Sequence, residues 1–128
     1  IEHSLKISNI LKLNDDELLL LSQMFNLSGG DSNQMSALLH RFGLQLVILT
    51  RGNNGSCLLT SDRCSQHPGT PTEVVDTIGA GDSFTAAAAY GILSGKDLDR
   101  VNETANRVAA FVCGRPGAMV PVPDHLKY

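Results

Sequence analysis

Hydrophobic residues along the chain form short continuous runs separated by longer stretches with helical spacing. The run Ile10–Leu13 predicts a buried strand, and the nearly uninterrupted run Leu44–Thr50 predicts a central strand covered on both faces. Ser56–Thr60 predicts a further strand. The turn-forming residues Gly52–Gly55 separate these last two runs, so we expect them to form a hairpin.

Helical patterns fill most of the remaining sequence. Asn14 predicts a helix N-cap, because three acidic residues and then a run of leucines follow it. Three further helices are predicted, over Ser32–Phe42, Asp82–Leu93 and Asp97–Val112. The predicted helix over Asp82–Leu93 consists mainly of small and apolar residues on every face, which is typical of a helix buried in a larger body. Ser61–Glu73 and Gly114–Pro123 are predicted to be loops. Helices alternating with strands indicate an α/β layered domain.

Composition narrows the class of protein. The 128 residues are 42% hydrophobic and 18% charged, enough for the core of one domain and too apolar for a disordered chain. A net charge of -3 without a basic cluster argues against a nucleic-acid partner. The longest apolar runs, Leu18–Leu21 and Ala86–Tyr90, fall far short of the roughly 20 residues that span a membrane. Three cysteines without metal-ligand spacing predict free thiols in the cytoplasm.

The segment Asp76–Asp82, Asp-Thr-Ile-Gly-Ala-Gly-Asp, carries the candidate chemistry. Gly79, Ala80 and Gly81 directly precede a predicted helix, so their backbone N–H groups and the helix dipole would form an anion hole. Asp82 at its edge could accept a proton from an attacking hydroxyl group. Phosphoryl transfer needs both parts. On these residues alone, a glycine-rich turn followed by an ordinary N-terminal acidic residue is the alternative.

This segment, extended to Phe84 (DTIGAGDSF), resembles the signature D-T-x-G-A-G-D of the ribokinase-like, PfkB-type carbohydrate kinases at every fixed position. Further similarities follow in the family's order along nearly the whole chain. Asn14–Glu17 is similar to the family's N-x-x-E motif, and Thr50–Gly55 to its T-x-G-x-x-G turn. Gly117-Ala118, followed by prolines, is similar to its C-terminal G-A motif.

The resemblance implies a three-layer α-β-α ribokinase-like fold. Residues 1–128 would be its C-terminal part, which binds nucleotide and supplies the catalytic base. The N-terminal half, with the sugar-binding residues and a small β-sheet lid, would precede the strand that ends at Asn14. The absence of an initiator methionine at Ile1 is in line with this expectation.

The resemblance also implies a role for each matching residue. Asp82 would be the general base that activates the sugar hydroxyl, and the N–H groups of Gly79–Gly81 would bind the transferring phosphoryl group. Asn14 and Glu17 would hold Mg²⁺ through water. The residues that would line the ATP pocket are Thr50, Arg51, Gly52, Asn53, Asn54, Gly55, Gly81 and Asn106. The backbone carbonyls that would surround a potassium-like ion belong to Asp76, Ile78, Val112, Arg115 and Gly117. Pro121 stands where the family often has a hydroxyl residue.

Each of these assignments has a structural alternative. Asn14 and Glu17 also have the spacing of a helix capping pair. Gly52–Gly55 is a hairpin turn whether or not it contacts a nucleotide. Asn106 would otherwise be an exposed helix residue.

The activity implied by the resemblance is ATP-dependent phosphorylation of a sugar hydroxyl, with fructose-like substrates expected because the chain as a whole looks most like fructokinases. The chain alone would be inactive. A non-catalytic nucleotide-binding remnant or regulatory module is one alternative, and a nucleoside kinase of the same superfamily is another. Because part of the cover of its apolar elements would come from the N-terminal half, we expect exposed apolar surface, and either self-association or marginal stability.

Overall fold

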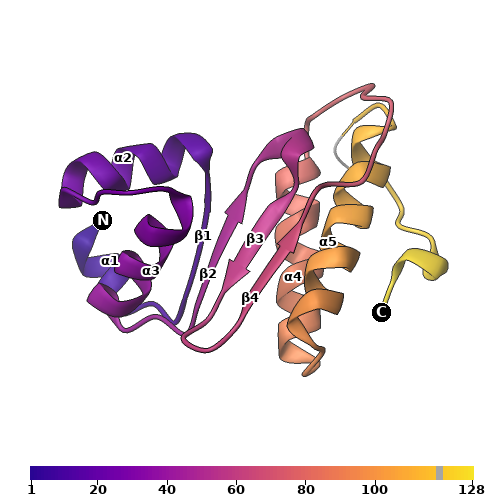
Figure 1. The fold of residues 1–128 in the computed structure, drawn as a ribbon. Coiled ribbons are helices and arrows are strands. Elements are labelled where there is room, and N and C mark those ends of the chain that lie inside the picture. Colours follow the sequence, from indigo (N-terminus) through magenta and orange to yellow (C-terminus); the bar gives the residue numbers. More distant parts are fainter. Residues whose placement is uncertain (118–119) are drawn as a thin grey trace. The chain divides into compact units, whose positions relative to one another are not determined.

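The structure is a computed structural model that describes residues 1–117 and 120–128 (Figure 1). Ala118 of the predicted Gly117-Ala118 motif therefore lies outside the described residues. The helices are α1 (Glu2–Lys6), α2 (Asp15–Phe25), α3 (Asp31–Phe42), α4 (Ala80–Leu93) and α5 (Leu98–Cys113), with short 3₁₀ turns at Gly52–Asn54 and Asp124–Leu126. The strands are β1 (Ile10–Asn14), β2 (Leu46–Thr50), β3 (Ser56–Leu59) and β4 (Cys64–His67).

The strands form one sheet in the order β1-β2-β3-β4. β1 and β2 are parallel and in register from Ile10 opposite Leu46 to Asn14 opposite Thr50. A parallel pair needs a crossover, and α2 and α3 supply it between these strands. β2 and β3 are neighbours joined by the turn at Gly52–Asn54, which confirms the predicted hairpin and the α/β class.

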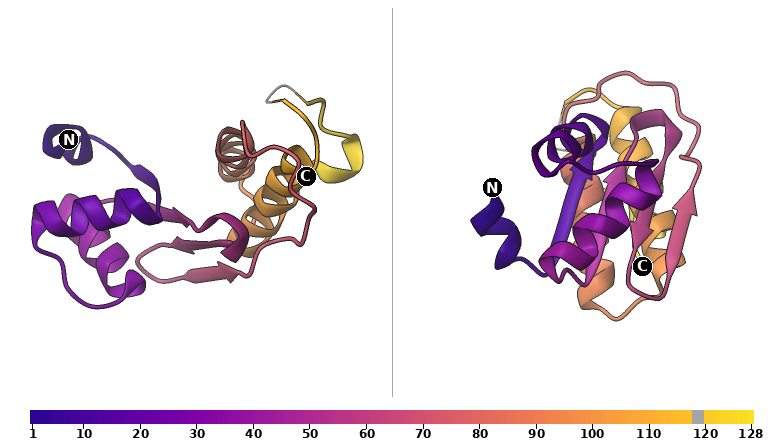
Figure 2. Two further views of the ribbon diagram at one scale, coloured as in Figure 1. Left: turned by 90° about the horizontal axis from the view of Figure 1, so that it is seen from above. Right: turned by 60° about the vertical axis from the view of Figure 1, so that its left-hand side comes forward.

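The described chain divides into two compact units, the first formed by residues 1–51 and 57–65 and the second by residues 52–56 and 66–128. The core of the first unit lies where α2 and α3 pack on β1 and β2 (Figure 2). Its most deeply buried side chains include Leu13, Met35, Leu38, Val47 and Leu49. The continuous apolar run of β2 is buried at Leu46–Leu49, as expected for an inner parallel strand.

Helix ends in this unit follow the predicted capping chemistry. The Asn14 side chain accepts a hydrogen bond from the Glu17 N–H (2.9 Å), and the Glu17 carboxylate accepts one from the Asn14 N–H (2.8 Å). This reciprocal pair is a capping box that fixes the start of α2 where β1 ends. α3 ends at Gly43, whose φ of 64° lies in the left-handed region that glycine adopts without strain.

In the second unit α4 and α5 lie side by side (Figure 1). α5 buries a stripe of Val101, Ala105, Val108 and Val112, as its spacing predicts. α4 buries Phe84, Ala88 and Gly91 but exposes Tyr90 and Leu93. The apolar residues of α4 are therefore buried along one face only, and the expected exposed apolar surface is present.

Two elements differ from the sequence prediction. β4 lies inside Ser61–Glu73, which the sequence predicts as loop, and α1 is not predicted at all. β4 has the polar sequence Cys-Ser-Gln-His, which gives no hydrophobic alternation, and it lies at the edge of the sheet. α1 is five residues long and buries Leu5 alone, too short for a helical period to be visible.

Within residues 1–117 and 120–128, no helix has both the length and the apolar content that crossing a bilayer requires.

Two leucine truncations test the core of the first unit. Leu38 is 0% exposed and Leu20 is 62% exposed. We expect Leu38→Ala to lower the free energy of unfolding by about 2–5 kcal/mol, because the substitution leaves a cavity. The matched control Leu20→Ala should change it by less than about 0.5 kcal/mol. Urea denaturation measures the free energy of unfolding of both variants. Equal losses of stability for the two would contradict the assignment of Leu38 to the core.

Candidate functional site

The start of α4 presents an open group of backbone amides. Gly79 precedes the helix with a φ of 80°, a left-handed conformation that favours glycine. Within the described residues, no side chain caps this 14-residue helix. The Ala80 N–H donates to the Thr77 carbonyl (3.3 Å), so the next amides, those of Gly81 and Asp82, carry the anion-binding capacity. A Cβ placed on Gly81 would meet no atom within 4 Å, so an anion can approach.

Asp82 lies in the first turn of α4, and its side chain is exposed. Its carboxylate therefore lies at the same helix end as the amides that can bind an anion. A hydroxyl group held beside the bound anion would find a proton acceptor there, which is the arrangement that phosphoryl transfer uses.

Asp76 fixes the loop that leads into α4. One carboxylate oxygen accepts from the Ile78 N–H (2.9 Å) and the other from the Gly117 N–H (3.2 Å). The backbone N–H groups of Val75 and Asp76 both donate to the Cys113 carbonyl at the end of α5 (2.8 and 3.1 Å). Asp76 thus joins the loop before α4 to the segment after α5.

These contacts bring together residues predicted to surround a monovalent cation. Asp76, Ile78 and Gly117 meet through the Asp76 carboxylate. Val112 and Arg115 lie at the end of α5, where the Arg115 N–H donates to the Val112 carbonyl (3.1 Å). The Val112 carbonyl is therefore already used as an acceptor, and the contacts of Ile78 and Gly117 are made by their N–H groups. The cation site itself stays a prediction.

The turn at residues 52–55 is held closely by the end of β4. Gly55 has a φ of 82°, and a Cβ there would lie 1.9 Å from the His67 carbonyl oxygen. Gly69 is also tight, since its Cβ would lie 2.7 Å from the Asn53 carbonyl oxygen. Asn53 and Asn54 are exposed. The turn therefore has a fixed backbone with two free amide side chains, which is compatible with the predicted nucleotide contact.

Asn106 is buried, at 7% exposed, so the alternative of an exposed helix residue is wrong. Its amide nitrogen donates to the Ser56 hydroxyl (2.7 Å), to the Asn102 carbonyl (2.8 Å) and to the Asn102 side-chain oxygen (3.1 Å). The Ser56 hydroxyl in turn donates to that side-chain oxygen. Asn106 therefore joins α5 to the residue that follows the 52–55 turn.

Sequence reasoning missed Ser56 and Asn102, which complete this network. Two asparagines four positions apart on the apolar face of an amphipathic helix were the available signal, since buried amides need hydrogen-bond partners. An open pocket of about 420 Å³ beside the same helix, with a mixed polar and apolar lining, was also missed. Its lining includes residues 70–73 together with Arg107, Phe111 and Arg115.

In the first unit, Asn14 and Thr50 end the paired strands β1 and β2 directly opposite each other. The Thr50 hydroxyl donates to the Leu13 carbonyl (3.4 Å), and Arg51 forms an ion pair with Asp31 (3.3 Å). Asn14 and Glu17 form the capping box and are exposed at this edge. The helix capping pair, which is the alternative to a Mg²⁺-binding role for Asn14 and Glu17, is therefore present.

Mg²⁺ prefers oxygen ligands and keeps several waters. The exposed amide and carboxylate of Asn14 and Glu17 fit that preference, and these two residues would hold the ion through water. Among the residues that the structure describes, no three His, Cys, Asp or Glu side chains gather to ligate a metal directly.

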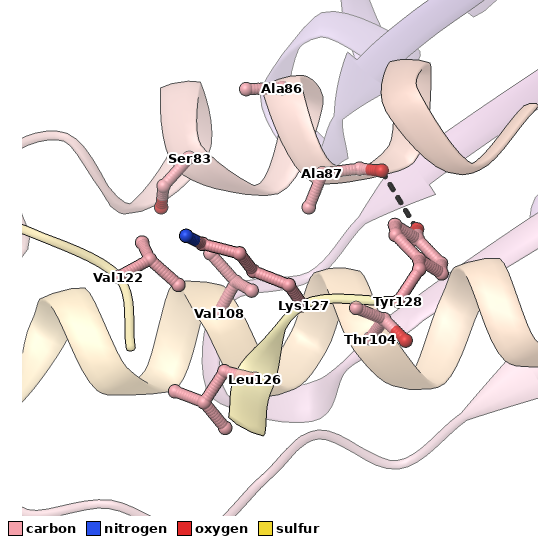
Figure 3. Close-up of a pocket in the computed structure, with 9 residues that line it drawn as sticks. All are labelled: Ser83, Ala86, Ala87, Thr104, Val108, Val122, Leu126, Lys127 and Tyr128. Carbon is pink, nitrogen blue, oxygen red and sulfur yellow. Dashed lines mark hydrogen bonds between the residues drawn. The ribbon is translucent and has the colours of Figure 1, made fainter. Parts of the chain in front are cut away.

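The C-terminal residues cover an apolar pocket of about 200 Å³ between α4 and α5 (Figure 3). The Tyr128 hydroxyl donates to the Ala87 carbonyl (2.7 Å), and burial raises the pKa of Tyr128 to about 12. The pocket is lined by Ser83, Ala86, Ala87, Thr104, Val108, Val122, Leu126, Lys127 and Tyr128. None of the predicted site residues lines it.

The chain was compared with known proteins. The model of the pfkB family of carbohydrate kinases matches residues 1–125. The chain belongs to this family. A fructosamine kinase of Bacillus subtilis is 32% identical over 73% of this chain and 33% of its own length.

Solved structures of other PfkB relatives show the same fold. An Escherichia coli protein described as a ribokinase II, in complex with ATP and Mg²⁺, has a TM-score of 0.82 and 29% identity over 92% of this chain and 37% of its own. A nucleoside kinase of Methanocaldococcus jannaschii has a TM-score of 0.82 and 26% identity over 95% of this chain and 39% of its own. The ribokinase-like α/β fold is therefore confirmed. The PfkB chain spans well under half of the length of each of these proteins.

The buried network around Asn106 yields a stability prediction. Ser56→Ala removes the hydroxyl that pairs with both asparagines, so the buried Asn102 and Asn106 amides each lose one hydrogen bond while keeping the bonds between them. We expect the free energy of unfolding to fall by about 1–3 kcal/mol. Ser61→Ala, at an exposed loop position, is the control and should change it by less than about 0.5 kcal/mol. A Ser56→Ala protein as stable as the control would show that the network does not hold α5 to β3.

Proposed function

We propose that this chain is the C-terminal, nucleotide-binding part of an enzyme that transfers the γ-phosphoryl group of ATP to a sugar hydroxyl, and that the chain alone is inactive. The start of α4 carries this proposal. There, the exposed Asp82 carboxylate adjoins amides that no described side chain caps. Membership in a carbohydrate kinase family supports the reaction class.

Each residue at this helix end has a distinct task in the proposed reaction. The amides of Gly81 and Asp82 donate to the oxygens of the transferring phosphoryl group, and the helix dipole favours its negative charge. Gly79 and Ala80 set the backbone direction that aims those amides outward. Asp82 accepts the proton of the sugar hydroxyl as the new O–P bond forms. The Asp76 bridge keeps this loop in place.

ATP and Mg²⁺ are the proposed cofactors. The E. coli relative in complex with both supports them. Thr50–Gly55 and Asn106 would line the nucleotide pocket, and the open pocket beside α5 offers room for part of the nucleotide. Mg²⁺ held near Asn14 and Glu17 would neutralise phosphate charge. A potassium-like ion among the carbonyls near Asp76 is also proposed, on the grouping of the five residues.

We propose a fructose-like sugar as the substrate, and the fructosamine kinase among the relatives supports a ketose-derived substrate. A nucleoside is the second candidate, favoured by the likeness to a nucleoside kinase. Assays of the full-length enzyme with fructose, ribose and adenosine separate the two. Calorimetry of the 128-residue chain with ATP tests the remaining alternative, a nucleotide-binding module without turnover.

Two further properties are proposed. Free Cys57, Cys64 and Cys113 support a reducing, cytoplasmic location. Exposed apolar side chains on α4, Tyr90 and Leu93, support self-association of the isolated chain.

The catalytic base is tested by Asp82→Asn in the full-length enzyme. We expect kcat to fall by about 10²–10⁴-fold, because the amide cannot accept the proton. The control Asp99→Asn changes an exposed acidic residue in the first turn of α5 and should leave kcat within about twofold. Steady-state assays measure both variants. Near-normal phosphorylation by Asp82→Asn would remove the base assignment.

Glu17→Gln separates the two roles of the capping pair. Glutamine can still close a capping box, so the free energy of unfolding should change by less than about 0.5 kcal/mol. The lost charge should raise the Mg²⁺ concentration for half-maximal activity several-fold. Magnesium titration of the full-length enzyme measures this. An unchanged Mg²⁺ requirement would show that Glu17 caps α2 and does not help to bind Mg²⁺.

A further inference from the structure

Two cysteines approach each other across the hairpin formed by β3 and β4. Cys57 lies in β3 and Cys64 in β4, and their sulfur atoms are 3.7 Å apart. Cys57 is 1% exposed, whereas Cys64 is exposed to solvent. Cys113 lies in α5, outside the hairpin. The proposed phosphoryl transfer uses neither hairpin cysteine.

The hairpin geometry is compatible with a bond between these sulfurs. β3 and β4 are hydrogen-bonded neighbours, and the Thr60 N–H donates to the Arg63 carbonyl (2.8 Å) where the hairpin turns. This pairing of Thr60 with Arg63 makes Cys57 and Cys64 diagonal neighbours on the two strands, and it is the sulfur separation of 3.7 Å that brings them within reach of each other. A disulfide needs a sulfur separation of about 2.05 Å, so the two sulfur atoms must move closer through side-chain rotation and strand adjustment.

We propose that Cys57 and Cys64 are a redox modification site, at which a low-molecular-weight disulfide of the glutathione type forms a reversible cross-link between β3 and β4. This proposal does not rest on kinase activity. Its structural basis is the sulfur contact, the strand pairing and the unequal exposure of the two thiols.

The chemistry proceeds in two exchanges. The Cys64 thiolate attacks one sulfur of glutathione disulfide, which forms a mixed disulfide and releases one glutathione thiolate that takes up the proton lost by Cys64. The Cys57 thiolate then attacks the Cys64 sulfur, and the second glutathione leaves and takes up the Cys57 proton. Two cysteine thiols are oxidised and one glutathione disulfide is reduced to two thiols. Burial raises the pKa of Cys57 to about 12, which makes exposed Cys64 the entry point.

The cross-link acts next to the 52–55 turn. β3 begins at Ser56, directly after that turn, and the end of β4 packs against Gly55. Oxidation would therefore join the two strands that hold the turn and restrict their separation.

Peptide mapping tests the proposal on the purified protein. Trypsin cleaves after Arg51, Arg63 and Lys96, so it places Cys57 in peptide 52–63 and Cys64 in peptide 64–96. After treatment with glutathione disulfide and alkylation of the remaining thiols, we expect these two peptides to be linked, and dithiothreitol to separate them. Glutathione on Cys64 together with alkylated Cys57 would overturn the proposal, and so would a link to Cys113.

Two single variants provide controls. Cys113→Ser should retain the linked pair in full, because Cys113 takes no part. Cys64→Ser, at an exposed position, should abolish the link and leave Cys57 without glutathione, since the buried thiol has no exposed partner to receive the oxidant. Loss of the link in Cys113→Ser, or glutathione on Cys57 in folded Cys64→Ser, would overturn the assignment.

Discussion

The second unit depends on one carboxylate that accepts two backbone hydrogen bonds. Asp76 binds the Ile78 N–H with one oxygen and the Gly117 N–H with the other. The first bond turns the chain toward Gly79 and so sets where α4 begins. The second joins that turn to the segment after α5. Because a charged acceptor strengthens both bonds, the direction in which the amides of α4 point is fixed by a residue outside the helix.

Several residues of the candidate site also hold the fold together. Asn14 and Glu17 cap α2, and Asn106 joins α5 to β3. Each uses polar atoms for local structure at an edge where a ligand is proposed to bind. A site residue that is hydrogen-bonded in this way is already oriented before a ligand arrives, which lowers the entropy lost on binding.

The elements with strong patterns could be predicted from the sequence, and those defined by distant partners could not. β2 is a continuous apolar run, and α5 has a clear helical stripe. β4 is polar and is recognisable only because β3 lies beside it. Asn106 is visible in the sequence as a polar residue of a predicted helix, yet its buried hydrogen bond is made with Ser56, 50 positions earlier. Likewise, the Ala80 N–H donates a hydrogen bond to the Thr77 carbonyl. This bond depends on the loop geometry and could not be predicted from the glycine-rich sequence before α4.

The close approach of Gly55 and Gly69 to opposite backbone segments has a consequence for how this region can vary. No side chain separates the turn from the end of β4, so neither glycine can acquire even a methyl group without displacing peptide carbonyls. A compensating change elsewhere would not help, because the obstacle is backbone. Within residues 53–55, variation is therefore confined to the side chains of Asn53 and Asn54. Divergence in ligand preference that arises through these three residues has only those two positions available.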